Sequence, residues 1–93
     1  MAYREFDWDD AKNAETLRLR GFDFDRVSQI FRGPVIETDD ERFDYGERRI
    51  QAVGRIDKEI FFVVYTWRGS IRRIISARRA SREERDDYRA EFG

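Results

Sequence analysis

Residues 60–66 read Ile-Phe-Phe-Val-Val-Tyr-Thr, an uninterrupted run of β-branched and aromatic residues. Such residues are typical of β-strands, and a continuous apolar run is expected where a strand is covered on both faces. The run therefore predicts a central strand, which needs partner strands on both of its edges.

Four segments have the composition of strands: residues 35–38, 49–56, 60–66 and 71–77. Asp57-Lys58 is expected to form the turn before the central run, and Arg68-Gly69 the turn after it. A short first strand could also end at Phe6 or Trp8. We expect an antiparallel sheet of about four strands, with a polar loop over residues 39–46.

Start and stop signals predict three helices: near residues 9–20, near residues 23–32, and from Ser81 to about residue 91. Asp9 and Asp23 are suited to cap the first two, and Gly21 is suited to end the first. Ser81 and Glu84 have the spacing of a capping box. The first helix would carry Ala11, Ala14 and Leu17 on one face. The predicted fold class is α+β, with two N-terminal helices, the sheet and a C-terminal helix.

The chain has 93 residues, which is the length of one domain, and we place that domain over residues 1–93. With 40% hydrophobic residues and a net charge of −1, the composition is that of a folded protein. Cysteine and histidine are absent, which excludes disulfide scaffolds, thiolate or imidazole metal sites and the usual general base. No apolar run approaches the roughly 20 residues of a membrane span, and the first residues do not form a signal peptide. We expect a cytoplasmic protein.

Charge is distributed unevenly along the chain. Residues 1–47 hold 13 acids and 7 bases, whereas residues 48–93 hold 7 acids and 12 bases. No acid occurs from Ile60 to Arg82, and this segment contains six arginines: Arg68, Arg72, Arg73, Arg78, Arg79 and Arg82. Arginine binds phosphate with a planar fork of N–H donors. The cluster predicts an anion site, and the alternative for each arginine is an ion pair with the acidic half of the chain.

Several short motifs occur in a fixed order: Trp8-Asp9-Asp10-Ala11-Lys12-Asn13, Phe24-x-x-Val27, Phe31-x-Gly33-Pro34, Asp44-Tyr45-Gly46-Glu47-x-Arg49, Val64-Tyr65-Thr66-x-Arg68-Gly69 and Arg73-Ile74-Ile75-Ser76-Ala77-Arg78. In combination they resemble the BrnT family of toxins from bacterial type II toxin–antitoxin systems. The resemblance extends from about residue 6 to about residue 88. It implies a RelE-like fold, a ribonuclease activity that halts translation by cutting RNA, and a BrnA-type antitoxin with a ribbon-helix-helix DNA-binding domain. It also implies a toxin dimer within the toxin–antitoxin complex, which would bind promoter DNA.

The chain departs from the family pattern at two places. Relatives often end the first helix with Lys-His-Gly, where this chain has Leu19-Arg20-Gly21. Arg20 cannot act as a base, although it could bind phosphate. Relatives often have an acid at the position of Trp67, whose ring could stack on a base of RNA.

Cleavage of RNA can use the 2′-hydroxyl group beside the scissile phosphate as the nucleophile. The protein must then orient the chain, transfer protons and stabilise the charge that develops on the phosphate. Arg73 and Arg78 are the leading candidates for phosphate contact, with Arg79 in support, because Arg73 on the last strand and Arg78 just past its end could converge on one phosphate. The alternative for Arg73 is a salt bridge to a neighbouring strand.

The groups available for proton transfer are Glu47, Tyr45, Tyr65 and Lys12, and Glu47 and Tyr65 are the catalytic candidates among them. Glu47 could take the 2′-hydroxyl proton, or it could pair with Arg49. Tyr65 could contact RNA, or it could be a core ring with its hydroxyl at the rim. Further RNA-binding candidates are Arg68, Arg20, Tyr45 and Trp67, and Tyr45 in its polar loop would be free to stack on a base.

Paired acids in this chain fall at helix starts, on an exposed helix and in a turn, so we expect no metal and no cofactor. The first functional hypothesis is a metal-independent endoribonuclease toxin. The alternatives are a non-catalytic module that binds nucleic acid or protein, and a partner-binding domain that docks through Tyr88 and Phe92.

Overall fold

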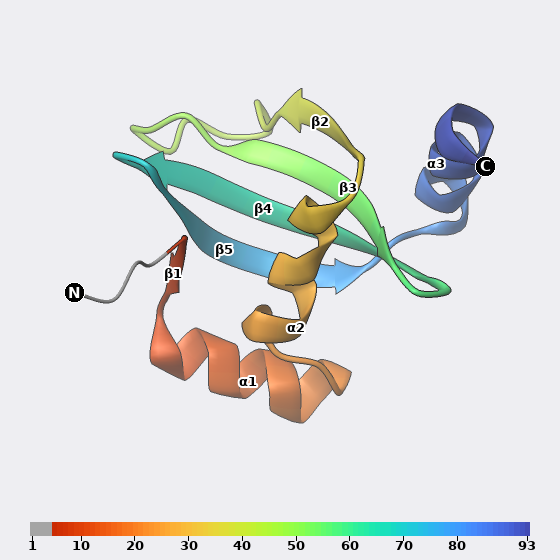
Figure 1. Ribbon diagram of the computed structural model, residues 1–93. Helices are drawn as coiled ribbons and strands as arrows, with labels where there is room; N and C mark the ends of the chain where they lie inside the picture. Colours follow the sequence, from red (N-terminus) through yellow and green to blue (C-terminus); the bar gives the residue numbers. More distant parts are fainter. Residues whose placement is uncertain (1–4) are drawn as a thin grey trace.

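The computed structural model describes residues 5–93 and contains one five-stranded sheet with three α-helices and a short 3₁₀ helix (Figure 1). The strands are β1 (Phe6–Trp8), β2 (Val35–Asp39), β3 (Ile50–Ile56), β4 (Glu59–Arg68) and β5 (Ile71–Arg79). The helices are α1 (Asp10–Arg20), α2 (Phe24–Ser28), the 3₁₀ helix η1 (Gln29–Arg32) and α3 (Arg82–Phe92). The α+β class and the C-terminal helix are confirmed.

The strand order is β1-β5-β4-β3-β2, so the apolar run lies in the central strand, as predicted. β2, β3, β4 and β5 pair antiparallel, whereas β1 pairs parallel with β5. The four predicted antiparallel strands are present, and the possible short first strand forms as β1. The expectation of a wholly antiparallel sheet is wrong, because β1 adds a fifth strand in parallel at one edge. A tight turn can join two antiparallel strands, whereas all the other strands of the sheet lie between β1 and β5 in sequence, so no local turn predicts their pairing. A segment of three residues is also too short to show a clear strand pattern.

Alternating side chains of β4 enter two separate cores on opposite faces of the sheet. Phe61, Val63 and Tyr65 belong to the larger core with α2 and η1, where Phe24, Val27 and Ile30 are fully buried. Ile60 belongs to the smaller core with Ala80 and Tyr88 of α3. Burial of β4 on both faces follows from this arrangement, in which α2 and α3 lie on different sides of the sheet (Figure 1).

The predicted helix over residues 23–32 forms as two pieces. Asp23 caps α2 as expected, by accepting a hydrogen bond from the backbone N–H of Arg26. The Oγ atom of Ser28 donates to the carbonyl of Asp25, and the chain then tightens into η1 before Gly33. A hydroxyl that bonds back to the helix backbone favours such an irregularity.

The predicted apolar face of α1 is wrong. Ala11, Ala14 and Leu17 are all exposed, and Leu17 retains 51% of its accessible surface. The inward face is polar instead: Asn13 accepts a hydrogen bond from the backbone N–H of Phe24, and Thr16 is buried. This helix therefore packs by satisfying backbone groups of its neighbours rather than by burying apolar side chains.

The capping box of α3 is present in full. Ser81 accepts from the backbone N–H of Glu84, and Glu84 accepts from the backbone N–H of Ser81. Tyr88 is buried and donates its hydroxyl to the carbonyl of Pro34. Within residues 5–93, no helix has the length and apolar composition needed to cross a membrane.

Gly54 is the position where η1 approaches the sheet most tightly. A Cβ atom at this glycine would lie 2.6 Å from Cβ of Ile30 and 3.0 Å from Cγ1 of Val35. Gly54→Ala should therefore lower the free energy of unfolding by about 1–3 kcal/mol through overpacking. Thermal unfolding monitored by circular dichroism checks this. Gly33→Ala is the matched control, because a Cβ atom there meets nothing within 4 Å, and equal melting temperatures for the two variants would contradict the packing account.

Candidate functional site

Four of the six arginines in the acid-free segment face carboxylates from other elements of the fold. Arg68 lies 3.2 Å from Glu47, Arg73 2.6 Å from Asp7, Arg78 2.8 Å from Glu84, and Arg79 3.1 Å from Glu59. The ion-pair alternative therefore holds for these four residues. The segment itself contains no acids, but the fold places acids from other elements beside its arginines.

The predicted convergence of Arg73 and Arg78 on one phosphate is wrong. Both lie on the same face of β5, opposite Thr66 and Phe62 respectively. Four residues of β4 separate these partners, which corresponds to roughly 13 Å along the strand. Arg73 is held by Asp7 at one end, and Arg78 by the two carboxylate oxygens of Glu84 at the other.

Arg79 lies on the opposite face of the sheet from Arg78. Its guanidinium is 5.1 Å from the ring of Phe22, and it donates to the carbonyl of Arg20. Arg20 in turn donates to the carbonyl of Ala77. Arg20 and Arg79 therefore tie the end of α1 to the end of β5 that also carries Arg78, far along the strand from Arg73.

Arg72 has a different environment from its neighbours on β5. Its guanidinium lies 4.3 Å from the ring centre of Phe31, 4.5 Å from that of Trp67 and 5.3 Å from that of Tyr65. Its Nε atom is buried without a hydrogen-bond partner among residues 5–93. In this described part of the chain, no carboxylate forms an ion pair with Arg72. Aromatic faces, rather than an anion, stabilise this cation.

Tyr65 has a buried ring and a hydroxyl that reaches the edge of the sheet, as its alternative reading predicted. The hydroxyl donates a hydrogen bond to Oε2 of Glu37 on β2. Burial raises the pKa of Tyr65 above its ordinary value, and the bond to Glu37 adds to this rise. The phenol therefore remains protonated at neutral pH and stays a donor.

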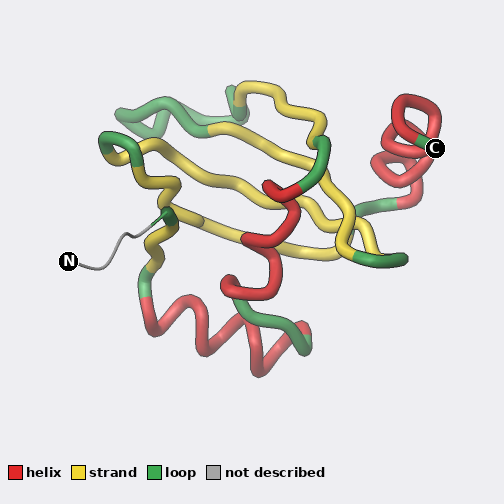
Figure 2. Tube along the Cα trace, in the orientation of Figure 1, coloured by secondary structure: helices red, strands yellow, loops and turns green. Residues whose placement is uncertain are grey.

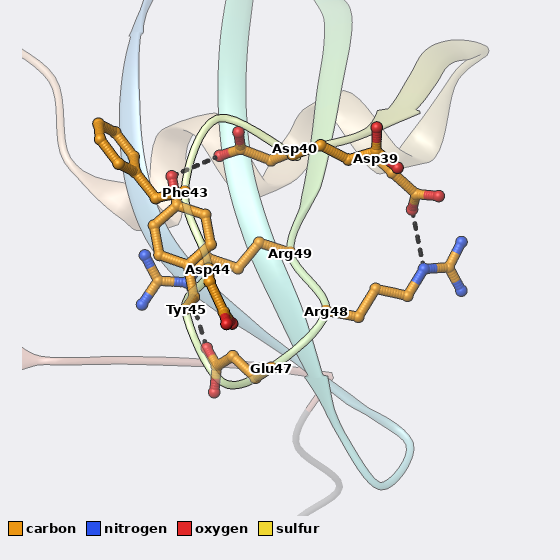
Figure 3. A pocket seen from close by; sticks show the side chains of 9 residues that line it. Asp39, Asp40, Phe43, Asp44, Tyr45, Glu47, Arg48 and Arg49 are labelled. Carbon is orange, nitrogen blue, oxygen red and sulfur yellow. Dashed lines mark hydrogen bonds and ion pairs between the residues drawn. The ribbon is translucent and has the colours of Figure 1, made fainter.

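The loop over residues 40–49, between β2 and β3, surrounds a hollow of about 390 Å³ (Figure 3). Its anchor is Asp40, whose buried carboxylate accepts two hydrogen bonds of 2.8 Å from the guanidinium of Arg42 and one from the hydroxyl of Tyr45. The Arg42 guanidinium holds the pKa of Asp40 well below its usual range, although burial opposes this effect.

Tyr45 is not free in its loop, contrary to the prediction. One face of its ring is covered by the guanidinium of Arg49 at 4.0 Å, and its hydroxyl is bound to Asp40. Glu47 accepts hydrogen bonds from both Arg49 and Arg68, each at 3.2 Å. The predicted alternative for Glu47, pairing with Arg49, is therefore present.

β4 ends beside the turn into β5, at the same end of the sheet as the loop between β2 and β3 (Figure 2). Three hollows lie at this end. Arg48 lines all three, and Trp67, which is 44% exposed, lines one of them. We define the β4-end site as Glu37, Arg48, Tyr65, Trp67 and Arg72. Arg68, Glu47 and Tyr45 lie on its rim, whereas Arg20, Arg78 and Arg79 lie at the other end of the strands.

Glu37, Arg48 and Arg72 were missed as site residues by the sequence. Glu37 lies in a short strand with no motif around it, and Arg48 fell at the unspecified position of the Asp44–Arg49 motif. Arg72 was one of six arginines in its segment, and only the rings that surround it in space distinguish it. Among the described residues, no three Asp, Glu, His or Cys side chains gather in a way that could hold a metal ion.

Comparison with protein families finds one match, to the family described as the ribonuclease toxin BrnT of type II toxin–antitoxin systems, over residues 8–84. The chain belongs to the BrnT family. This confirms the resemblance drawn from its motifs. No curated protein matches the chain.

Membership in the BrnT family makes RNA the substrate class and an antitoxin the partner class. The matched residues include the whole β4-end site and its rim. They also include Arg20 and Trp67, the two departures from the pattern of relatives.

The Asp40–Arg42 pair should stabilise the loop that forms the site. Asp40→Asn removes the charge from a buried, doubly hydrogen-bonded carboxylate, and should lower the free energy of unfolding by about 1–3 kcal/mol at pH 7. Because the pKa of Asp40 is depressed in the folded state, the carboxylate stabilises the fold above about pH 4, its unfolded value, and this contribution is lost as the pH falls through the folded value. Urea unfolding of both proteins at several pH values measures the difference. Glu41→Gln is the exposed control, and a gap between wild type and Asp40→Asn that widens toward acid would contradict the assignment.

Proposed function

We propose that this chain is a metal-independent endoribonuclease toxin that cleaves RNA at the β4-end site and thereby blocks translation. The observation that carries the proposal is the combination of an exposed tryptophan, Trp67, with the guanidinium of Arg72 at 4.5 Å and the hollows around Arg48. Exposed aromatic rings beside arginines are the means by which proteins bind single-stranded RNA.

RNA would bind through two kinds of contact. A base stacks on the exposed ring of Trp67, and the phosphates meet Arg48 and Arg68, which line the same hollow. Arg72 lies behind Trp67 and keeps one N–H group without a partner among the described residues. Its positive charge is fixed by the surrounding rings, as is needed for preorganised stabilisation of a developing negative charge.

No metal is required by this chemistry, because RNA carries its own nucleophile and arginines supply positive charge. Arg73, Arg78 and Arg79 remain proposed phosphate contacts on the flanking chain, together with Arg20. Each of the three on β5 would have to exchange an internal carboxylate for a phosphate. Such an exchange costs little at the exposed Arg79–Glu59 pair, whose net contribution to stability is small, and more at the half-buried pairs of Arg73 and Arg78. Tyr45 and Glu47 would then shape the rim of the site rather than contact the scissile phosphate.

The proposed inhibitor is a BrnA-type antitoxin with a ribbon-helix-helix domain. Within the complex the toxin would form a homodimer, and the assembly would bind promoter DNA. The family supports an antitoxin partner. Covering the β4-end site would be a direct way to inhibit, because it blocks the arginines from RNA. A short ribbon-helix-helix reading frame beside this gene would support the assignment.

The second candidate is a binding module without catalytic activity. It is favoured by the absence of histidine from the chain and by Arg20 at the position where relatives often have one. Both candidates bind RNA, and they differ in whether a phosphodiester bond breaks.

Purified protein should cleave single-stranded RNA in the presence of EDTA and leave a 5′-hydroxyl on the downstream fragment. Gel analysis of an end-labelled RNA, followed by treatment with polynucleotide kinase to detect the 5′-hydroxyl, measures this. Intact RNA that is nevertheless retained in a filter-binding assay would instead support the binding module. Cleavage that requires added Mg²⁺ would contradict the metal-independent proposal.

Trp67→Ala should weaken the binding of a non-cleavable RNA about 5- to 150-fold, which corresponds to the roughly 1–3 kcal/mol of one base stack. Fluorescence anisotropy with an RNA that carries 2′-deoxy substitutions measures the dissociation constant. Leu19→Ala is the control, because Leu19 is 62% exposed on α1 and far from the site. Equal affinities for the two variants would remove Trp67 from the binding surface.

A further inference from the structure

Glu37 is the acidic residue of the β4-end site, and its contacts differ from those of the acids around it. It lies on edge strand β2 opposite Ala52, and it is exposed. Its hydrogen-bond partner among the described residues is the hydroxyl of Tyr65, a neutral donor. It lines a hollow of about 400 Å³ together with Arg48, so a ligand in that hollow would contact the carboxylate directly.

Three other acids that line the hollows are bound to cations. Asp39 pairs with Arg48 at 2.8 Å, and Asp40 accepts two hydrogen bonds from Arg42. Glu47 accepts from two arginines at once. A carboxylate whose oxygens are engaged by guanidinium groups is a poor proton acceptor. Glu41 and Asp44 line the loop hollow, not the one that Glu37 shares with Arg48 and Asp39. In that shared hollow Glu37 is therefore the carboxylate best placed to accept a proton.

We propose that Glu37 is the general base of the RNA cleavage reaction, with Tyr65 as the positioning residue that orients it. This inference rests on the proposed function and adds the group that the sequence could not supply. Glu37 takes the place of Glu47 as the proposed base, because the carboxylate oxygens of Glu47 are occupied by Arg49 and Arg68.

In the proposed step, a carboxylate oxygen of Glu37 takes the proton from the 2′-hydroxyl group. The 2′-oxygen then forms a bond to phosphorus while the bond between phosphorus and the 5′-oxygen breaks. The departing 5′-oxygen takes a proton from water, and the hydroxide left behind is neutralised by the proton that Glu37 releases. The products are a 2′,3′-cyclic phosphate and a 5′-hydroxyl, with no change in oxidation state.

The surrounding residues support this role geometrically. Tyr65 is 1% exposed, so its hydroxyl is held at a fixed point, and it donates to one oxygen of Glu37 while the other oxygen remains available. Arg48 lines the same hollow, and Arg72 lies against the ring of Tyr65. Arg48 is therefore the positive group beside the position where the phosphate would gain negative charge, and Arg72 lies beyond the ring of Tyr65.

The test compares single-turnover cleavage of one RNA by wild type, Glu37→Gln and Glu47→Gln. Glu37→Gln should slow cleavage about 100-fold or more, as expected for loss of a general base. Its affinity for an RNA with a 2′-deoxy group at the cleavage position should stay within about threefold of wild type, because the amide retains the shape of the side chain. Glu47→Gln should retain cleavage within about tenfold of wild type.

Two further measurements separate catalysis from structure. Added formate should restore part of the activity of Glu37→Ala, because a small carboxylate can occupy the vacated space. Tyr65→Phe alone should slow single-turnover cleavage about tenfold. The same substitution should have no further effect on the cleavage rate of Glu37→Gln, since a positioning residue acts through the group it orients.

Cleavage by Glu37→Gln at a rate within threefold of wild type would overturn the assignment of Glu37 and leave the proposed function intact. The same applies if Glu47→Gln alone abolishes cleavage. A wild-type protein that leaves RNA intact would overturn the proposed function, and the assignment of Glu37 with it.

Discussion

Burial of β4 on both faces is the constraint on which the rest of the structure depends. Odd-numbered side chains such as Phe61 and Val63 enter the core with α2 and η1, and Ile60 enters the core with α3. At about 1.5–3 kcal/mol for each large apolar side chain removed from water, this strand dominates the stability of a small domain. Burial ends at Trp67, where the strand emerges from the cores. The β4-end site is therefore a direct result of where the apolar run stops.

Ion pairs compensate much of the positive charge in the basic segment of a chain with 17 arginines. Four of its arginines each face a carboxylate from outside β5; the acids are Asp7, Glu47, Glu59 and Glu84. Arg72 and Arg82 have no such ion pair among the described residues, and aromatic rings surround the guanidinium of Arg72. One of these rings is Trp67 at the end of β4, where RNA is proposed to bind.

Local signals in the sequence predicted most of the fold. The apolar run, the Asp57-Lys58 turn and the Ser81–Glu84 capping box each depend on neighbours in the chain, and each is present. The parallel pairing of β1 and the polar inner face of α1 depend on groups far away in the sequence, and both were missed. The candidate site could be described only in part from the sequence for the same reason. Tyr65 and Trp67 were proposed from motifs, but the hydrogen bond between Tyr65 and Glu37 joins residues 28 positions apart.

The central claim is that the cleaved part of the RNA binds where β4 ends, and that the arginines at the other end of β5 contact only the flanking chain. Chemical-shift mapping by NMR, with ¹⁵N-labelled protein and an RNA made non-cleavable by 2′-deoxy substitution, tests it most directly. The account predicts the largest amide shifts at Glu37, Arg48 and residues 65–72. Shifts concentrated at Arg20, Arg78 and Arg79, with residues 65–72 unchanged, would contradict it.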